Sequence, residues 1–262
     1  MIVAGVQRLG ARFLAIRVVL AALILVPVVV AGPASIARAA QPDDLPVEVS
    51  AGGGFVNSSS YEAGSYAFSV QRDGTAYLVT ARHVAPRGAL VYGSGGLLGG
   101  TSEVSRSRDA AYVRLDRAVP VGVVQIATSD TGAPVTAAVD DVASRGTIEV
   151  GQRVCHSGYA ESTQDAGGFV CGDVVDVPRV CRAYEADTGC EITMRSDEGQ
   201  RVGWLGDSGG PVWQSVGSGR IRLLGVFTSV SSPTGGPPTR GHFVPAFDVL
   251  DDLGGTPVRA SS

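Results

Sequence analysis

The sequence predicts an all-β protein, either a β-sandwich or a pair of β-barrels. Three features favour this class: 36 glycines and 14 prolines that supply turns, short valine-rich apolar runs at near-regular spacing, and the lack of any sustained helical periodicity. At 262 residues the chain is long enough for one large β domain or two small ones with a buried core.

The first half divides into short strands separated by turn signals. We expect strands at 66–72, 75–80, 89–92, 110–115 and 122–127. The pair Asp73-Gly74 lies between the first two strands and predicts a tight hairpin turn. The stretch 129–145 is polar and predicts a connection between the two halves.

The second half repeats the pattern of short apolar runs and ends in a helix. We expect strands at 152–156, 169–177, 190–195, 211–214, 220–229 and 242–245. A short helix follows at 247–253, and the Ser-, Pro- and Gly-rich stretch 231–239 indicates an exposed loop.

Residues 1–39 have the composition of a secretory signal peptide. Three arginines precede the apolar run 18–31, and Ala37-Arg38-Ala39 follows it as an A-x-A cleavage signal. The run has 14 residues, fewer than the roughly 20 needed to cross a bilayer. We therefore expect cleavage after Ala39 and secretion, with an uncleaved signal anchor as the alternative. A short polar segment, 40–50, then leads into the folded domain.

Charge and cysteine content limit the possible partners and cofactors. A net charge of −4 argues against nucleic acid, whose phosphates need a clustered basic surface. The four cysteines of an exported chain predict two disulfides, and their spacing alone leaves three pairings open: Cys155, Cys171, Cys181 and Cys190. No C-x-x-C pair is present and only three histidines occur, so we expect neither a metal nor any other cofactor.

The motif Gly206-Asp207-Ser208-Gly209-Gly210-Pro211 is the strongest chemical signal in the chain. Glycines around a single serine allow a sharp turn and leave backbone N–H groups free to face a substrate. A nucleophilic serine needs that exposure, together with two N–H donors for the oxyanion. Six defined residues in a row are unusual for a plain glycine-rich turn. We therefore predict that Ser208 is a nucleophile.

A serine nucleophile also needs a base, and the choices are His83, His156 and His242. His83 ends a strand-like run, as expected for a residue held at the edge of a sheet. A carboxylate must orient the imidazole, and Asp109 stands immediately before the apolar run 110–113. Taken alone, either residue has an ordinary structural explanation.

Together, three motifs resemble the signatures of trypsin-like serine proteases: Thr80-Ala81-Arg82-His83, Asp109-Ala110-Ala111-Tyr112-Val113 and the serine motif, in that family's order. Residues 150–158, with Cys171-Gly172 following, resemble the secreted bacterial streptogrisin and α-lytic protease branch. The resemblance covers residues 51–253 and leaves 254–262 as a tail. It implies two six-stranded antiparallel barrels, about 51–128 and 146–246, with the site in the cleft between them.

The resemblance also implies a function, that of a serine endopeptidase working through an acyl-enzyme. Ser208 would be the nucleophile, His83 the base, Asp109 the orienting carboxylate, and the N–H groups of Gly206 and Ser208 the oxyanion hole. An extended polypeptide substrate would pair with the strand at Thr228, Ser229 and Val230. Cys155–Cys171 matches a disulfide of the bacterial branch, which leaves Cys181–Cys190. We expect a monomer that has no membrane contact once the signal is cleaved.

Several residues depart from the family pattern. Val84 stands where a cysteine is frequent, and Arg82, before the base, replaces a small residue and could lower its proton affinity. His156 occupies a position that is commonly arginine in the bacterial branch. We hypothesise that protonated His156 pairs with Asp207 and supports the oxyanion loop, with a raised pKa as the consequence. A surface His156, with an arginine serving Asp207, is the alternative.

The primary specificity pocket is left open by the sequence. An ungapped register puts Val202 at its floor, which favours a medium or large apolar residue before the scissile bond. A gap would bring Asp197 or Glu198 there instead.

Two other functions compete with the endopeptidase. A catalytically silent relative that binds peptides or proteins is favoured by Arg82 and by the missing cysteine after His83. An α/β-hydrolase esterase is disfavoured, because it needs G-x-S-x-G and alternating helices, and the motif here is G-D-S-G-G.

Overall fold

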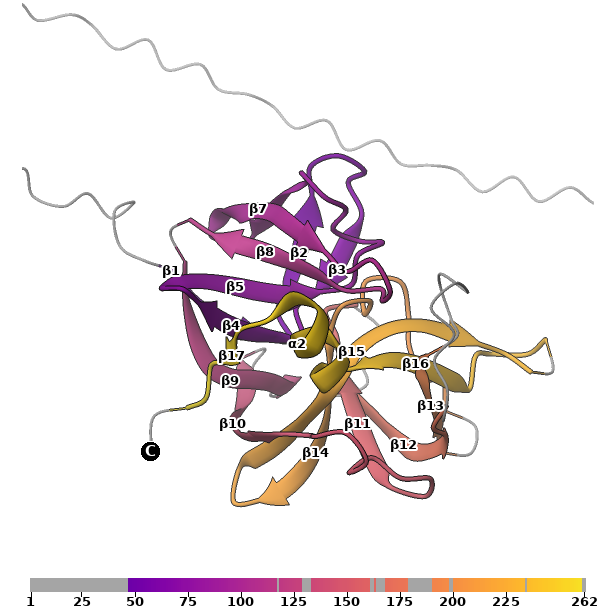
Figure 1. Ribbon diagram of the computed structural model, residues 1–262. Helices are drawn as coiled ribbons and strands as arrows, with labels where there is room; N and C mark the ends of the chain where they lie inside the picture. Colours follow the sequence, from indigo (N-terminus) through magenta and orange to yellow (C-terminus); the bar gives the residue numbers. More distant parts are fainter. Residues whose placement is uncertain are drawn as a thin grey trace, which may run out of the picture. The chain divides into compact units, whose positions relative to one another are not determined.

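The computed structural model describes residues 47–116, 118–128, 133–160, 163, 168–178, 190–197, 200–233 and 235–260. The expected signal peptide and residues 40–46 of the expected polar segment 40–50 lie outside these ranges, whereas residues 47–50 belong to a strand and not to a simple lead-in segment. Within them, no helix is long and apolar enough to span a membrane. Strands make up most of the regular structure of the described chain, and a short helix lies near its C-terminal end, as the sequence predicts (Figure 1).

The second half forms a closed barrel of six strands, each antiparallel to both neighbours (Figure 1). The pairing of β15 with β16 closes the ring. Its strands, in ring order, are β15 (Arg220–Ser231), β14 (Pro211–Gly217), β11 (Arg153–Ser157), β12 (Phe169–Asp176), β13 (Ile192–Ser196) and β16 (Arg240–Pro245). The expected second barrel is confirmed.

The first half forms an antiparallel sheet of eight strands, where six were expected. Four of its strands, at 54–57, 63–65, 96–104 and 256–257, were not predicted, and the predicted strand at 122–127 lies in the other sheet. The sheet order is β17 (Thr256–Pro257), β4 (Phe68–Arg72), β5 (Thr75–Thr80), β8 (Ala111–Leu115), β7 (Gly96–Val104), β6 (Leu90–Gly93), β2 (Gly54–Asn57) and β3 (Ala63–Ser65). Residues after the helix, expected as a tail, supply β17.

Local turn chemistry confirms the predicted hairpin between β4 and β5. Arg72 pairs with Thr75, and Asp73 and Gly74 have φ of 50° and 76°. Two successive positive φ values are typical of the turn that matches the twist of a two-residue hairpin.

The prediction of a plain connection at 129–145 is wrong. β10 (Pro134–Val142) pairs antiparallel with β9 (Ala118–Thr128) and parallel with β15, while β1 (Val47–Ala51) adds to β9. β10 exposes its first three residues and buries only Ala137 and Val139, so its sequence has little apolar signal. The strand exists because its neighbours supply hydrogen bonds, which composition does not reveal.

β7 was missed because glycine argues against a strand. A Cβ on Gly99 would lie 1.8 Å from the Arg114 carbonyl oxygen of β8, so only glycine allows the two strands to approach this closely.

The helix α2 (Ala246–Leu253), predicted at 247–253, ties the chain's end to the first half (Figure 1). Val249 and Leu253 belong to the same buried cluster as Leu78 and Tyr112 of the first sheet. The Tyr112 hydroxyl donates to the Gly254 carbonyl at 2.6 Å. The core therefore runs from one half into the other.

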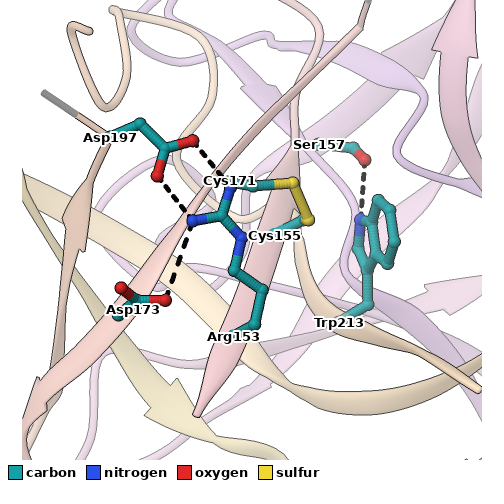
Figure 2. The surroundings of a disulfide bond; sticks show 7 residues. All are labelled: Arg153, Cys155, Ser157, Cys171, Asp173, Asp197 and Trp213. Atoms are coloured by element: carbon teal, nitrogen blue, oxygen red, sulfur yellow. Dashed lines mark hydrogen bonds and ion pairs between the residues drawn. A yellow bond between two sulfur atoms is a disulfide. The ribbon is translucent and has the colours of Figure 1, made fainter. Parts of the chain in front are cut away.

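The Cys155–Cys171 disulfide joins directly opposed residues of β11 and β12, and its prediction is confirmed (Figure 2). Cys190 is also disulfide-bonded. Its expected partner, Cys181, lies outside the described residues.

Candidate active site

The pairing of β5 with β8 brings His83 to Asp109. Thr80 lies opposite Ala111, so the turn that leaves β5 meets the residues that enter β8. His83 Nδ1 lies 2.5 Å from Asp109 Oδ2, and the His83 backbone N–H donates to Asp109 Oδ1 at 3.0 Å. These two contacts set the orientation of the imidazole. With Nδ1 donating to the carboxylate, Nε2 carries the lone pair of the neutral ring.

The charge environment favours protonation of His83. Burial lowers its pKa, but the hydrogen bond and charge of Asp109, with smaller contributions from Glu62 and Glu191, outweigh burial and raise the pKa above 6.5. Arg82 does not produce the expected lowering. Its guanidinium donates to the Ser105 carbonyl at 3.2 Å.

The loop that carries Ser208 depends on glycine at two positions. Gly206 and Gly209 have φ of 105° and 89°, which favour glycine. A Cβ on Gly209 would lie 2.1 Å from Thr80 Oγ1 and 2.3 Å from the Ser65 carbonyl oxygen. The Ser208 loop of the second half therefore packs directly on β3 and β5 of the first half.

Ser65 holds this loop and was missed in the sequence. Its N–H donates to the Ser208 carbonyl at 2.8 Å, and its hydroxyl donates to the Gly206 carbonyl at 2.7 Å. Tyr159 N–H donates to the same hydroxyl at 2.9 Å. No local pattern marks this serine, because its partners lie far along the chain.

The Ser208 hydroxyl itself donates to the Thr228 carbonyl of β15, at 3.1 Å. Among the described residues, no hydrogen bond joins it to His83. Neither the Gly206 N–H nor the Ser208 N–H donates to another group within the described ranges, so both remain available to a ligand.

Asp207 is fully buried, and its partners differ from those expected. Oδ2 accepts from Thr163 Oγ1 at 2.6 Å and from Trp204 N–H at 2.9 Å, and Oδ1 accepts from Ala160 N–H at 3.2 Å. A Cβ on Gly158 would lie 2.0 Å from Oδ1, so the segment 158–160 closely surrounds the carboxylate.

The prediction of an ion pair between protonated His156 and Asp207 is wrong, because the imidazole is neutral and binds a different group. His156 is fully buried, and its Nε2 donates to the Val202 carbonyl. Its ring stacks on Phe227, with centroids 4.0 Å apart and planes 8° apart. Burial lowers the pKa of His156 more than the charge of Asp207 raises it, so the ring is neutral near pH 7.

The ring of the third histidine, His242, contacts two hydroxyls other than that of Ser208. Its Nδ1 lies 3.2 Å from Thr193 Oγ1 and its Nε2 lies 2.8 Å from Ser231 Oγ. Burial, aided by Arg240, lowers its pKa.

The strand β15 extends past the end of its pairing with β14, and the extension contains Thr228, Ser229 and Val230. The β14 pairing reaches β15 only as far as Val226, and no described strand pairs with 228–230 on that side. On the other side, Ser229 and Val230 pair with β16. This leaves an open strand edge beside Ser208, the feature that an added peptide strand needs.

Of the two acidic candidates for the pocket floor, Asp197 is held elsewhere. Both of its carboxylate oxygens accept from the Arg153 guanidinium, at 2.5 Å and 2.6 Å, beside the disulfide (Figure 2). Glu198 lies outside the described residues. Val202 is fully buried in the barrel core with Phe227 and Phe243.

The closed antiparallel barrel, the second sheet and the terminal helix together define the chymotrypsin fold of serine proteases. Solved structures share it at low identity. Thermobifida fusca protease A is 22% identical with a TM-score of 0.57, covering 82% of this chain and 100% of its own. A Nocardiopsis protease is 19% identical with a TM-score of 0.58 and the same coverage, and Cellulomonas bogoriensis chymotrypsin is 22% identical with a TM-score of 0.56 and the same coverage. No family model and no curated protein sequence matches the chain.

Proposed function

We propose that this protein is a secreted serine endopeptidase whose catalytic residues are Ser208, His83 and Asp109. One observation carries the proposal: Asp109 contacts both the imidazole and the backbone N–H of His83, which leaves Nε2 as a base. Gly209 of the serine motif packs on Thr80 and Ala81, just before His83 in the chain. The same order of residues occurs in the family that the sequence resembles.

In the proposed reaction, His83 Nε2 takes the proton of the Ser208 hydroxyl as its oxygen attacks a peptide carbonyl. The N–H groups of Gly206 and Ser208 receive the oxyanion. His83 then protonates the leaving amine, and the acyl-enzyme is released when water attacks with His83 again as the base. The Asp109 carboxylate stabilises the imidazolium.

We expect substrate binding at the Thr228 carbonyl to release the Ser208 hydroxyl for the first step of the reaction. It accepts the Ser208 hydroxyl in the free protein. A substrate main chain that adds to the β15 edge would donate an N–H to the same carbonyl, because strand addition uses the carbonyls of an open edge. Displaced from Thr228, the hydroxyl can rotate toward His83.

The disulfides agree with export. Cys155–Cys171 and the bonded Cys190 suit an oxidising compartment, where such bonds persist. The composition of residues 1–39 supports a cleaved signal, after which we expect a monomer without membrane contact.

A second candidate function has a specific observation in its favour. The Ser208 hydroxyl donates to Thr228 and not to His83. A catalytically silent protein that binds extended peptides along β15 would have the same free-state contact.

Covalent labelling with a fluorophosphonate separates the two functions, because the reagent reacts only with an activated serine. We expect stoichiometric labelling of the wild-type protein, loss of labelling in Ser208→Ala, and unchanged labelling in Ser215→Ala, where the serine lies exposed on β14. Folded protein that stays unlabelled from about pH 6 to 9, the range in which a histidine base works, would overturn the endopeptidase and favour the binding function.

A further inference from the structure

The place of the primary specificity pocket follows from the contacts around the nucleophile. If a substrate pairs with β15 at 228–230 and has its scissile carbonyl at Ser208, the side chain before the scissile bond is expected between β15 and the segment 202–206 that precedes Ser208. The contacts of Gly203 and Val202 with β15 and β16 then show how much room is left there.

Phe227 fills the floor of this space. A Cβ on Gly203 would lie 3.0 Å from Phe227 Cζ, and a Cβ on Gly241 would lie 2.7 Å from Phe227 Cε2 and 3.1 Å from Val202 Cγ2. The ring therefore extends from the segment 202–206 across to β16. Phe227 and Val202 are both buried, with exposed fractions of 1% and 0%, so neither offers a surface to a ligand.

Val230 narrows the mouth of the same space. The Cβ position of Gly203 lies 3.2 Å from Val230 Cγ1, which puts a methyl group of β15 against the opposite wall. Val230 is partly exposed, at 37%, as expected for a residue at an entrance.

The Phe227 ring has no room to move aside. His156 stacks on it and also donates to the Val202 carbonyl, so the same imidazole holds the ring and the floor. The Phe227 N–H donates to the Gly210 carbonyl at 2.8 Å, and its carbonyl accepts the Gly209 N–H at 2.7 Å. Beyond the ring, the closely packed core contains Met194, Leu224 and Phe243.

We propose that Phe227 and Val230 close the primary pocket, so that this enzyme cleaves after glycine or alanine and rejects larger residues. The inference rests on the proposed endopeptidase function. It revises the expectation of a medium or large apolar residue, which assumed that Val202 was an accessible floor. A hydrophobic pocket that lacks room for one methylene lowers kcat/KM for the larger substrate by roughly 10–200-fold. Substrates with leucine or phenylalanine before the scissile bond should therefore have a kcat/KM at least about 100-fold below that of alanine substrates.

The test is cleavage of a peptide series that differs only in the residue before the scissile bond: glycine, alanine, valine, leucine and phenylalanine. For the wild-type protein we expect kcat/KM for alanine to exceed that for leucine and phenylalanine by about 100-fold or more. Phe227→Ala deepens the space and Val230→Gly widens its mouth. Each should raise cleavage after leucine by about 10-fold, and the double variant should also accept phenylalanine.

Leu223→Ala is the matched control, because Leu223 is buried on the same strand but belongs to the other buried cluster and does not pack with Phe227 in the barrel core. It should lose stability yet keep the preference for alanine. If Phe227→Ala does not fold, Val230→Gly alone tests the closed pocket. The Val230 side chain is partly exposed, so its removal costs less core packing.

Fluorophosphonate labelling of the same samples separates this inference from the proposed function. Absence of labelling overturns the endopeptidase itself. A labelled wild-type protein that cleaves after leucine or phenylalanine as well as after alanine overturns only the closed pocket. Labelled protein that cleaves no member of the series, or variants whose preference is unchanged, also overturns it.

Discussion

Replacing Asp207 by asparagine tests whether backbone and hydroxyl donors alone stabilise the buried carboxylate beside Ser208. Among the described residues, the carboxylate accepts hydrogen bonds from Thr163 Oγ1, Trp204 N–H and Ala160 N–H, at 2.6, 2.9 and 3.2 Å. Asparagine has nearly the same shape, but its amide replaces one acceptor oxygen by an NH2 group with two donor hydrogens.

The expected loss of stability follows from these contacts. If the amide oxygen takes the place of Oδ2, the contacts with Thr163 and Trp204 are kept as weaker, uncharged bonds. The amide nitrogen then faces the Ala160 N–H, donor against donor. Loss of one charge-assisted bond costs about 1.5–3 kcal/mol, and the unsatisfied buried Ala160 donor adds about 1–3 kcal/mol. We expect a total near 4 kcal/mol.

The assay is urea unfolding of wild type and Asp207→Asn, with fluorophosphonate labelling at low urea. With an m-value of about 1–3 kcal/mol/M, a loss of about 4 kcal/mol lowers the midpoint by more than about 1 M. The rate of labelling should also fall, because the bond from Trp204 N–H shapes the turn that presents Gly206 and is weaker in the variant. Asp197→Asn is the control, since Asp197 lies at the surface beside Arg153. A midpoint within about 0.3 M of wild type would refute the reasoning.

Three further predictions concern the base, the disulfide and the interface between the halves. Because Asp109 raises the pKa of His83, the labelling rate should rise with pH through a value above 6.5, and the stabilisation from protonated His83 should be full below 6.5 and lost as pH rises through the folded pKa. Asp109→Asn should shift the pH profile of the labelling rate to lower pH and reduce kcat/KM by roughly 10⁴-fold. An unshifted profile would contradict the assignment of Asp109. Cys155→Ser with Cys171→Ser opens a loop of sequence separation 16 and should cost about 3 kcal/mol, or roughly 6–12 °C in Tm by calorimetry; a change below about 2 °C would count against it. Ser65→Ala removes the donor to the Gly206 carbonyl and the acceptor of Tyr159 N–H, so it should cost about 2 kcal/mol in urea unfolding and slow labelling, whereas wild-type values for both would show that Ser65 does not hold the loop.

The sequence predicts those parts of the fold whose signal is local. The β4–β5 hairpin follows from Asp73-Gly74, and β15 and α2 follow from apolar runs of the expected length. β7 and β10 do not, because glycine and exposed polar residues mask them. Gly99 is required by the approach of a neighbouring strand, and β10 by partners on both sides, so neither strand can be inferred from its own residues.

The same limit applies to the site. The sequence by itself determined the serine motif, the order of His83, Asp109 and Ser208, and the candidate disulfide at Cys155. The tertiary structure decided what surrounds them. The Asp207 carboxylate accepts from a hydroxyl 44 residues away and not from the His156 imidazole. His156 donates to a carbonyl 46 residues away, and Ser65 donates to the Gly206 carbonyl across 141 residues. Burial decides these pairings, because a buried imidazole is more stable neutral and a buried carboxylate needs donors within reach. Only the folded chain shows which groups are buried together.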